Sequence, residues 1–152
     1  MSSDIEIDGT HGTSVSRVAS IQQEGFKPTN GRLGVGIYFW SKSIYSEYLA
    51  CSWWRQQYEK GGYRDDKNTA CGIINAKFRL EEKYFLDLND KILKEKLAVI
   101  CQEQNIKYRT DARQCAAVIS LFVKKLEDKF NRQFKLLEMP VAPPDPKYAP
   151  NY

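Results

Sequence analysis

Two short motifs near the start of the chain carry residue types that could bind a flat, polar ligand. The first is His11-Gly12-Thr13, which contains the single histidine of the sequence. The imidazole can hydrogen-bond a ligand hydroxyl, and Gly12 has no Cβ to keep a ligand away from its backbone. We expect this motif at a strand-to-helix junction, where unpaired N–H groups at the helix start would suit a phosphate. The alternative is an ordinary surface histidine in a loop.

The second motif is Gly34-x-Gly36-x-Tyr38, which lies within an apolar run. Two glycines in a predicted strand are costly unless something packs against the backbone. Tyr38 follows Gly36 by two residues, so its side chain would share one strand face with Gly36 and could stack on an aromatic ring. The alternative is a β-bulge followed by a core tyrosine. Together, the two motifs predict two walls of one pocket.

The two motifs, joined by a short predicted helix that ends at Gly25-Phe26, resemble the opening of the ADP-ribosyltransferase fold. Within that superfamily they resemble the branch that includes diphtheria toxin and the poly(ADP-ribose) polymerases, which has a His-Tyr-Glu triad. The close resemblance covers residues 5–50, and residues 71–88 resemble the strand pair that follows there only loosely. It implies an α+β fold with a split β-sheet core and flanking helices.

The resemblance also implies roles for the motif residues, with NAD as the substrate and no metal ion. His11 would hydrogen-bond the adenosine-side ribose, and the Gly12 backbone would hold the nicotinamide carboxamide. Tyr38 would stack on the nicotinamide ring. The residues expected to bind NAD are His11, Gly12, Thr13, Gly36, Tyr38, Ser43 and Tyr48.

The helix predicted after Tyr38 would complete the nicotinamide site. A second aromatic ring from this helix often closes the clamp, and either Tyr48, which we favour, or Tyr45 could supply it. Ser43 or Ser41 would place a hydroxyl near the carboxamide. A core role for either tyrosine is the alternative.

Cleavage of the bond between nicotinamide and ribose passes through an oxocarbenium-like transition state, which a nearby carboxylate stabilises. The family places this glutamate on a late strand, and Glu138 is the only carboxylate of the late strand predicted over residues 134–139. The predicted catalytic residues are therefore His11, Tyr38 and Glu138. Alternatively, Glu138 faces solvent on an edge strand, or the catalytic strand follows residue 152. Glu103 and Glu127 lie in predicted helices and fit the role less well.

The function that the resemblance implies is an NAD-dependent mono-ADP-ribosyltransferase of toxin, effector or defence type. Its acceptor would be a macromolecule, either a protein or a nucleic acid. The alternative function is a catalytically inactive module that binds NAD or ADP-ribose or serves as an interaction surface. A nuclease with a Gly-Ile-Tyr strand is disfavoured because the sequence lacks the Tyr-Ile-Gly run that such nucleases pair with it.

Hydrophobic periodicity and turn residues predict the elements that would position these side chains. We expect the order β-α-β-α-β-β-α-α-β, which favours an α+β domain over a doubly wound sheet. Residues 64–68 are expected to form an exposed loop. The predicted strands are residues 5–8, 33–40, 71–80, 84–88 and 134–139, and the predicted helices are residues 14–24, 43–60, 90–104 and 111–130.

Length and composition predict one domain over residues 1–139, followed by a proline-rich tail or linker over residues 140–152. The formal net charge of +4 permits a nucleic-acid partner without requiring one. The four cysteines form no C-x-x-C pair, so a zinc site is not expected. We expect the cysteines to be free thiols in the reducing cytoplasm. No apolar run is long enough for a membrane span, and no signal peptide is recognised.

Overall fold

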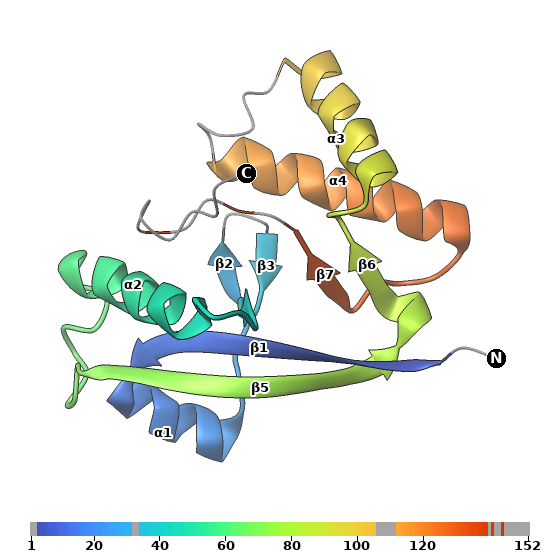
Figure 1. Ribbon diagram of the computed structural model, residues 1–152. Coiled ribbons are helices and arrows are strands. Elements are labelled where there is room, and N and C mark those ends of the chain that lie inside the picture. Colours follow the sequence, from blue (N-terminus) through green and yellow to red (C-terminus); the bar gives the residue numbers. More distant parts are fainter. Residues whose placement is uncertain (1–2, 32–33, 106–111, 140, 142–143, 145–152) are drawn as a thin grey trace. The chain divides into compact units, whose positions relative to one another are not determined.

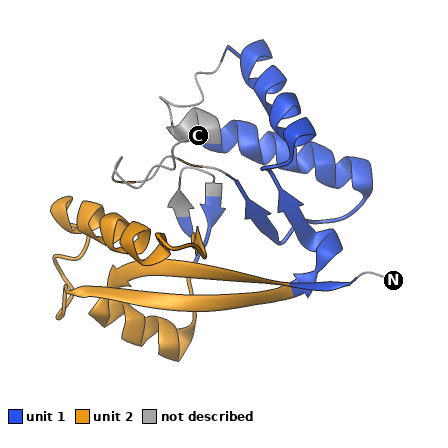
Figure 2. Cartoon of the chain, viewed as in Figure 1, with its two compact units in different colours: residues 1–5, 28–37, 80–140 blue, residues 6–27, 38–79, 141–152 orange. Residues whose placement is uncertain are grey.

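The chain is an α+β protein, as predicted, in which helices and short sheets are mixed (Figure 1). The computed structural model describes residues 3–31, 34–105, 112–139, 141 and 144. The chain divides into two compact units (Figure 2). Unit 1 comprises residues 1–5, 28–37 and 80–140, and unit 2 comprises residues 6–27, 38–79 and 141–152.

Unit 2 is built on a sheet with the strand order β4-β1-β5. These strands are β1 (Asp4–Ser14), β4 (Trp40–Ser41) and β5 (Cys71–Glu81), and residues 4–5 and 80–81 at two of their ends belong to unit 1. β1 pairs antiparallel with β4, so that Thr10 lies opposite Trp40. The predicted strand over residues 71–80 is confirmed. The strand predicted at residues 5–8 is longer than expected and includes His11.

Two helices cover this sheet, α1 (Val15–Glu24) and α2 (Ser46–Glu59), and they lie on opposite sides of it (Figure 1). Both helices are confirmed to within a few residues. The Ser14 hydroxyl caps α1 by accepting a hydrogen bond from the Arg17 N–H, at 3.3 Å. Gly25 ends the helix at a positive φ of 81°, which glycine adopts without strain, and its N–H donates to the Ile21 carbonyl.

The strand predicted over residues 33–40 is confirmed only at Gly34–Gly36 and at Trp40. A short strand, β3 (Gly34–Gly36), pairs antiparallel with β2 (Thr29–Gly31), where no strand is predicted from the sequence. Residues 37–39 are not in a strand, and the chain rejoins a sheet only at β4. The two glycines of β3 provide no side chains to pack a longer strand, and its pairing partner is a polar segment without an apolar signal.

Unit 1 contains a small core of leucines and other apolar residues between two helices and a parallel strand pair. The helices are α3 (Lys91–Glu103) and α4 (Ala112–Phe130), and both are confirmed. β6 (Phe85–Asp87) lies after a 3₁₀ turn and pairs parallel with β7 (Leu136–Glu138). The buried core residues are Leu86, Leu88, Leu97, Cys101, Val118, Phe122 and Leu126.

Most of the proline-rich tail over residues 140–152 lies outside the described residues. Within the described part of the chain, no helix combines the length and the apolar character that crossing a membrane requires.

Candidate functional site

His11 of the first motif and Tyr38 of the second motif meet in unit 2 through one hydrogen bond. His11 lies on β1, and its Nδ1 is 2.8 Å from the carbonyl oxygen of Tyr38. A carbonyl oxygen can only accept, so Nδ1–H is the donor. In the neutral ring, Nε2 is then left as a hydrogen-bond acceptor. No other hydrogen bond of this ring is present among the described residues. The imidazole is therefore held in one tautomer, with a nitrogen suited to a ligand hydroxyl.

Phenylalanine side chains hold the same imidazole in place. The ring centroids of His11 and Phe26 are 5.4 Å apart in an edge-to-face arrangement, and those of His11 and Phe39 are 5.7 Å apart. Phe39 in turn packs edge-to-face on Phe78 of β5, at 4.7 Å. A Cβ on Gly9 would stand 2.8 Å from the Phe39 Cβ, so the missing side chain at Gly9 makes room for this ring. His11 is partly buried, and its ring has a fixed orientation.

Gly12 lies against α2. A Cβ built at Gly12 would be 2.1 Å from the carbonyl oxygen of Ala50, a fully buried residue of that helix. The close approach of helix and strand accounts for the absence of a side chain at Gly12 without any ligand. The contact between the Gly12 backbone and a carboxamide therefore remains a prediction of the resemblance.

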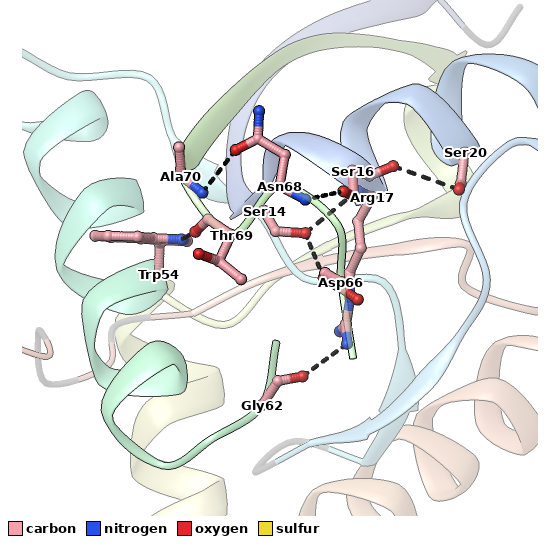
Figure 3. Close-up of polar contacts among 10 residues, drawn as sticks. All are labelled: Ser14, Ser16, Arg17, Ser20, Trp54, Gly62, Asp66, Asn68, Thr69 and Ala70. Carbon is pink, nitrogen blue, oxygen red and sulfur yellow. Dashed lines mark hydrogen bonds and ion pairs between the residues drawn. The ribbon is translucent and has the colours of Figure 1, made fainter. Parts of the chain in front are cut away.

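The start of α1 is covered by the chain itself (Figure 3). The Val15 N–H donates to the Ala70 carbonyl at 2.9 Å, and the Ser16 N–H donates to the Asn68 carbonyl at 3.2 Å. The next N–H, that of Arg17, is taken by the Ser14 hydroxyl. The expectation of unpaired N–H groups for a phosphate is therefore wrong, because residues 68–70 fold over the helix start and supply carbonyl partners.

Asp66, just before residues 68–70, also contacts the start of α1 (Figure 3). The Ser14 hydroxyl donates to the Asp66 carboxylate at 2.5 Å, and the Arg17 Nε donates to the same oxygen at 3.0 Å. Arg17 also donates to the Gly62 carbonyl at 2.7 Å. The Asp66 side chain is 15% exposed, so the exposed loop predicted over residues 64–68 is wrong at this position. The contact spans 52 residues of sequence, and no local pattern signals it.

Thr13 is buried beside this segment, at 4% exposure. Its side chain hydrogen-bonds Tyr63, a buried ring over which the Arg17 guanidinium lies at 4.8 Å. Burial raises the pKa of the Tyr63 phenol above its ordinary value of 10.0. Thr13 thus has a structural partner, and its predicted contact with NAD remains a prediction.

A surface hollow of about 520 Å³ lies between β1, the turn before α2, and β5. Ser43 and Tyr48, which we predicted to contact NAD, line it, and Tyr48 is 57% exposed. Lys42 and Lys77 also line the hollow. The lining combines an aromatic ring, hydroxyls, an amide and charges of both signs, which suits a polar ligand with a flat ring. Its residues are Asp8, Gly9, Thr10, Lys42, Ser43, Ile44, Ser46, Glu47, Tyr48, Asn75, Ala76 and Lys77.

The residues that β5 contributes to this hollow, Asn75, Ala76 and Lys77, were not predicted from the sequence. The Asn75 side chain on β5 accepts a hydrogen bond from the Thr10 hydroxyl on β1 at 3.2 Å, which holds its amide in place. Asn75 and Lys77 alternate with apolar residues on β5, and that pattern marks them as outward-facing without indicating a site. His11, Gly12 and Tyr38 are not among the residues that line the hollow.

Gly36 and Glu138 belong to unit 1, whereas the other predicted site residues belong to unit 2. A Cβ at Gly36 would meet nothing within 4 Å, so this face of β3 is open. Glu138 lies on β7 opposite Asp87 and is partly buried, and its carbonyl accepts from the Leu88 N–H at 2.8 Å. Of the other acids considered, Glu127 accepts from the Phe134 N–H. The catalytic role of Glu138 remains a prediction.

Among the described residues, no three His, Cys, Asp or Glu side chains gather into a group that could hold a metal ion. Comparison with known proteins finds no family model, no curated protein and no solved structure that matches the chain.

Proposed function

We propose that the chain is an NAD-dependent mono-ADP-ribosyltransferase of toxin, effector or defence type, which acts in the cytoplasm on a protein or nucleic-acid acceptor. The observation that carries the proposal is the hydrogen bond from His11 to the Tyr38 carbonyl. Two motifs 27 residues apart, each of which resembles part of one NAD site, are in direct contact. A split-sheet ADP-ribosyltransferase core is part of the same proposal.

The arrangement of unit 2 suits the roles that the resemblance implies. With Nδ1–H committed to Tyr38, the His11 Nε2 is left to accept a hydrogen bond from a ribose hydroxyl. The exposed ring of Tyr48 and the Ser43 hydroxyl line a hollow large enough for a nicotinamide and its ribose. In this proposal Tyr38 supplies the second ring that stacks on the nicotinamide. The backbones of Gly12 and Gly36 and the hydroxyl of Thr13 contact NAD.

In the proposed reaction, the bond between the nicotinamide nitrogen and ribose C1′ breaks, and nicotinamide leaves as a neutral molecule. A nucleophile on the acceptor forms the new bond to C1′ and loses its proton. Positive charge develops on the ribose as the first bond breaks, so a carboxylate beside it lowers the barrier. We assign that carboxylate to Glu138.

A second candidate is an inactive module that binds NAD or ADP-ribose. The observation that favours it is the lining of the hollow, which includes Ser43 and Tyr48 but none of the predicted catalytic residues His11, Tyr38 and Glu138. Such a module would bind the dinucleotide through unit 2 and release no nicotinamide.

The test is to incubate the purified chain with NAD, to measure released nicotinamide, and to measure NAD binding by calorimetry in parallel. We expect Glu138→Gln to lower nicotinamide release by about 10²–10³-fold and to keep NAD binding. Glu103→Gln, an exposed glutamate on α3, is the matched control and should change neither value. Binding without release would favour the inactive module. A chain that neither binds nor cleaves NAD would overturn both candidates.

A further inference from the structure

Two cysteine thiols of unit 2 are in contact. The Sγ atoms of Cys51 and Cys71 are 3.4 Å apart, and both cysteines are free and partly buried. Cys51 lies on α2, and Cys71 is the first residue of β5, 20 residues later. A disulfide bond is about 2.05 Å long, so the two sulfurs need to approach each other by about 1.35 Å to form one.

We propose that Cys51 and Cys71 form an oxidation site, at which a low-molecular-weight disulfide converts the thiol pair into an intramolecular disulfide that links α2 to β5. Nothing in the proposed NAD chemistry uses these thiols, so the proposal stands independently of it. The contact holds the two sulfurs together in the reduced protein, which favours the intramolecular bond over two separate mixed disulfides.

The reaction consumes one oxidant disulfide and releases two small thiols. One cysteine loses its proton and attacks an oxidant sulfur, which forms a mixed disulfide and expels a thiolate that takes up the proton. The second cysteine loses its proton and attacks the cysteine sulfur of the mixed disulfide, which expels a second thiolate. The protein is oxidised by two electrons and loses two hydrogen atoms, and the oxidant is reduced by the same amount.

The surroundings of Cys71 make these steps depend on pH. Burial, aided by the hydrogen bond with Cys51, raises the pKa of the Cys71 thiol to about 12. Because only the thiolate attacks, Cys71 is a slow nucleophile near neutral pH. We therefore expect the rate of disulfide formation to rise with pH.

The disulfide would restrain two walls of the hollow. Tyr48 lies one helical turn before Cys51 on α2, and Asn75 lies four residues after Cys71 on β5. A covalent link between α2 and β5 fixes the separation of the elements that carry these two side chains. Oxidation would therefore restrict the movement of these two side chains without changing any residue that lines the hollow.

The experiment treats the full chain with oxidised glutathione at mildly alkaline pH, and then counts free thiols by alkylation and intact mass. We expect the wild type to lose two of its four thiols and to yield one linked peptide pair that contains Cys51 and Cys71. Cys51→Ser and Cys71→Ser should each abolish the link. Cys101→Ser, which changes a buried cysteine of unit 1, is the matched control and should keep it.

Four thiols that stay free, or glutathione bound without an internal link, would overturn the proposal. A link that joins Cys51 or Cys71 to another cysteine would overturn it as well. The peptide map of the oxidised wild type decides between these outcomes even where a serine variant fails to fold.

Discussion

The Ala50 carbonyl oxygen lies 2.1 Å from the position that a Cβ on Gly12 would occupy. Backbone cannot retreat from such a clash as a side chain can, so Gly12→Ala would push α2 away from β1. We expect a loss of about 1–3 kcal/mol in the free energy of unfolding, measured by urea denaturation.

Gly36→Ala is the matched control for this substitution. A Cβ at Gly36 would meet nothing within 4 Å, so we expect the free energy of unfolding to change by less than about 0.5 kcal/mol. Equal losses for the two variants would contradict the assignment of Gly12 to helix packing. If NAD lies against β3 as proposed, Gly36→Ala will weaken NAD binding while leaving stability unchanged.

Substitution of two exposed tyrosines of α2 distinguishes a specific contact with NAD from a general effect of removing a surface ring. Tyr48 lines the hollow, whereas Tyr58, of similar exposure, stacks on Trp54 outside it. Stacking of a base on an aromatic side chain is worth about 1–3 kcal/mol. We therefore expect Tyr48→Ala to weaken NAD binding by about 10-fold or more in calorimetry and Tyr58→Ala to leave the Kd unchanged. Identical Kd values for Tyr48→Ala and the wild type would exclude Tyr48 from the NAD site.

The carboxylate of Asp66 stabilises the junction between β1 and α1. It accepts from the Ser14 hydroxyl and from Arg17, and it is largely shielded from water. Hydrogen bonds to a charged group contribute about 1.5–3 kcal/mol, so we expect Asp66→Asn to lower the free energy of unfolding by about 1–2 kcal/mol. The lower figure allows for solvent screening of the half-exposed Arg17.

Asp65→Asn, at the exposed neighbouring position, is the control and should have little effect. A double-mutant cycle with Ser14→Ala measures the coupling between the two side chains directly. We expect the two losses to be non-additive. Strict additivity would show that Ser14 and Asp66 contribute independently.

Local signals in the sequence were sufficient for the helices and for β5. Thr13 or Ser14 at the start and Gly25 at the end predict the limits of α1, because capping depends on residues within one turn of the helix end, and Ser14 is the N-cap in the structure. The alternation of apolar residues along residues 71–80 likewise predicts β5. These features depend on near neighbours, which the sequence displays.

Contacts between distant segments could not be predicted in the same way. The carbonyls that cover the start of α1 come from Asn68 and Ala70, and the partner of β3 is the polar strand β2. Ser43 and Tyr48 could be proposed for a site, but Asn75 and Lys77 join them only through the pairing of β5 with β1. Sequence periodicity identifies which face of an element is apolar and not which element covers it.

Glu6 gives β1 and β5 a pH-dependent connection. Its carboxylate pairs with Arg79 and, at 3.4 Å, with Lys77. The hydrogen bond from Arg79, followed by the charge of Lys77, lowers the pKa of Glu6 from its ordinary value of 4.5. A carboxyl whose pKa is lower in the folded state stabilises the fold above its unfolded pKa, and the contribution is lost as pH falls through the folded value.

The difference in unfolding midpoint between the wild type and Glu6→Gln should therefore be largest near neutral pH and shrink progressively below pH 4.5. Urea denaturation across this range measures it, with Glu59→Gln near the end of α2 as the control, and a difference that is constant or grows in acid would contradict the ion pair's role.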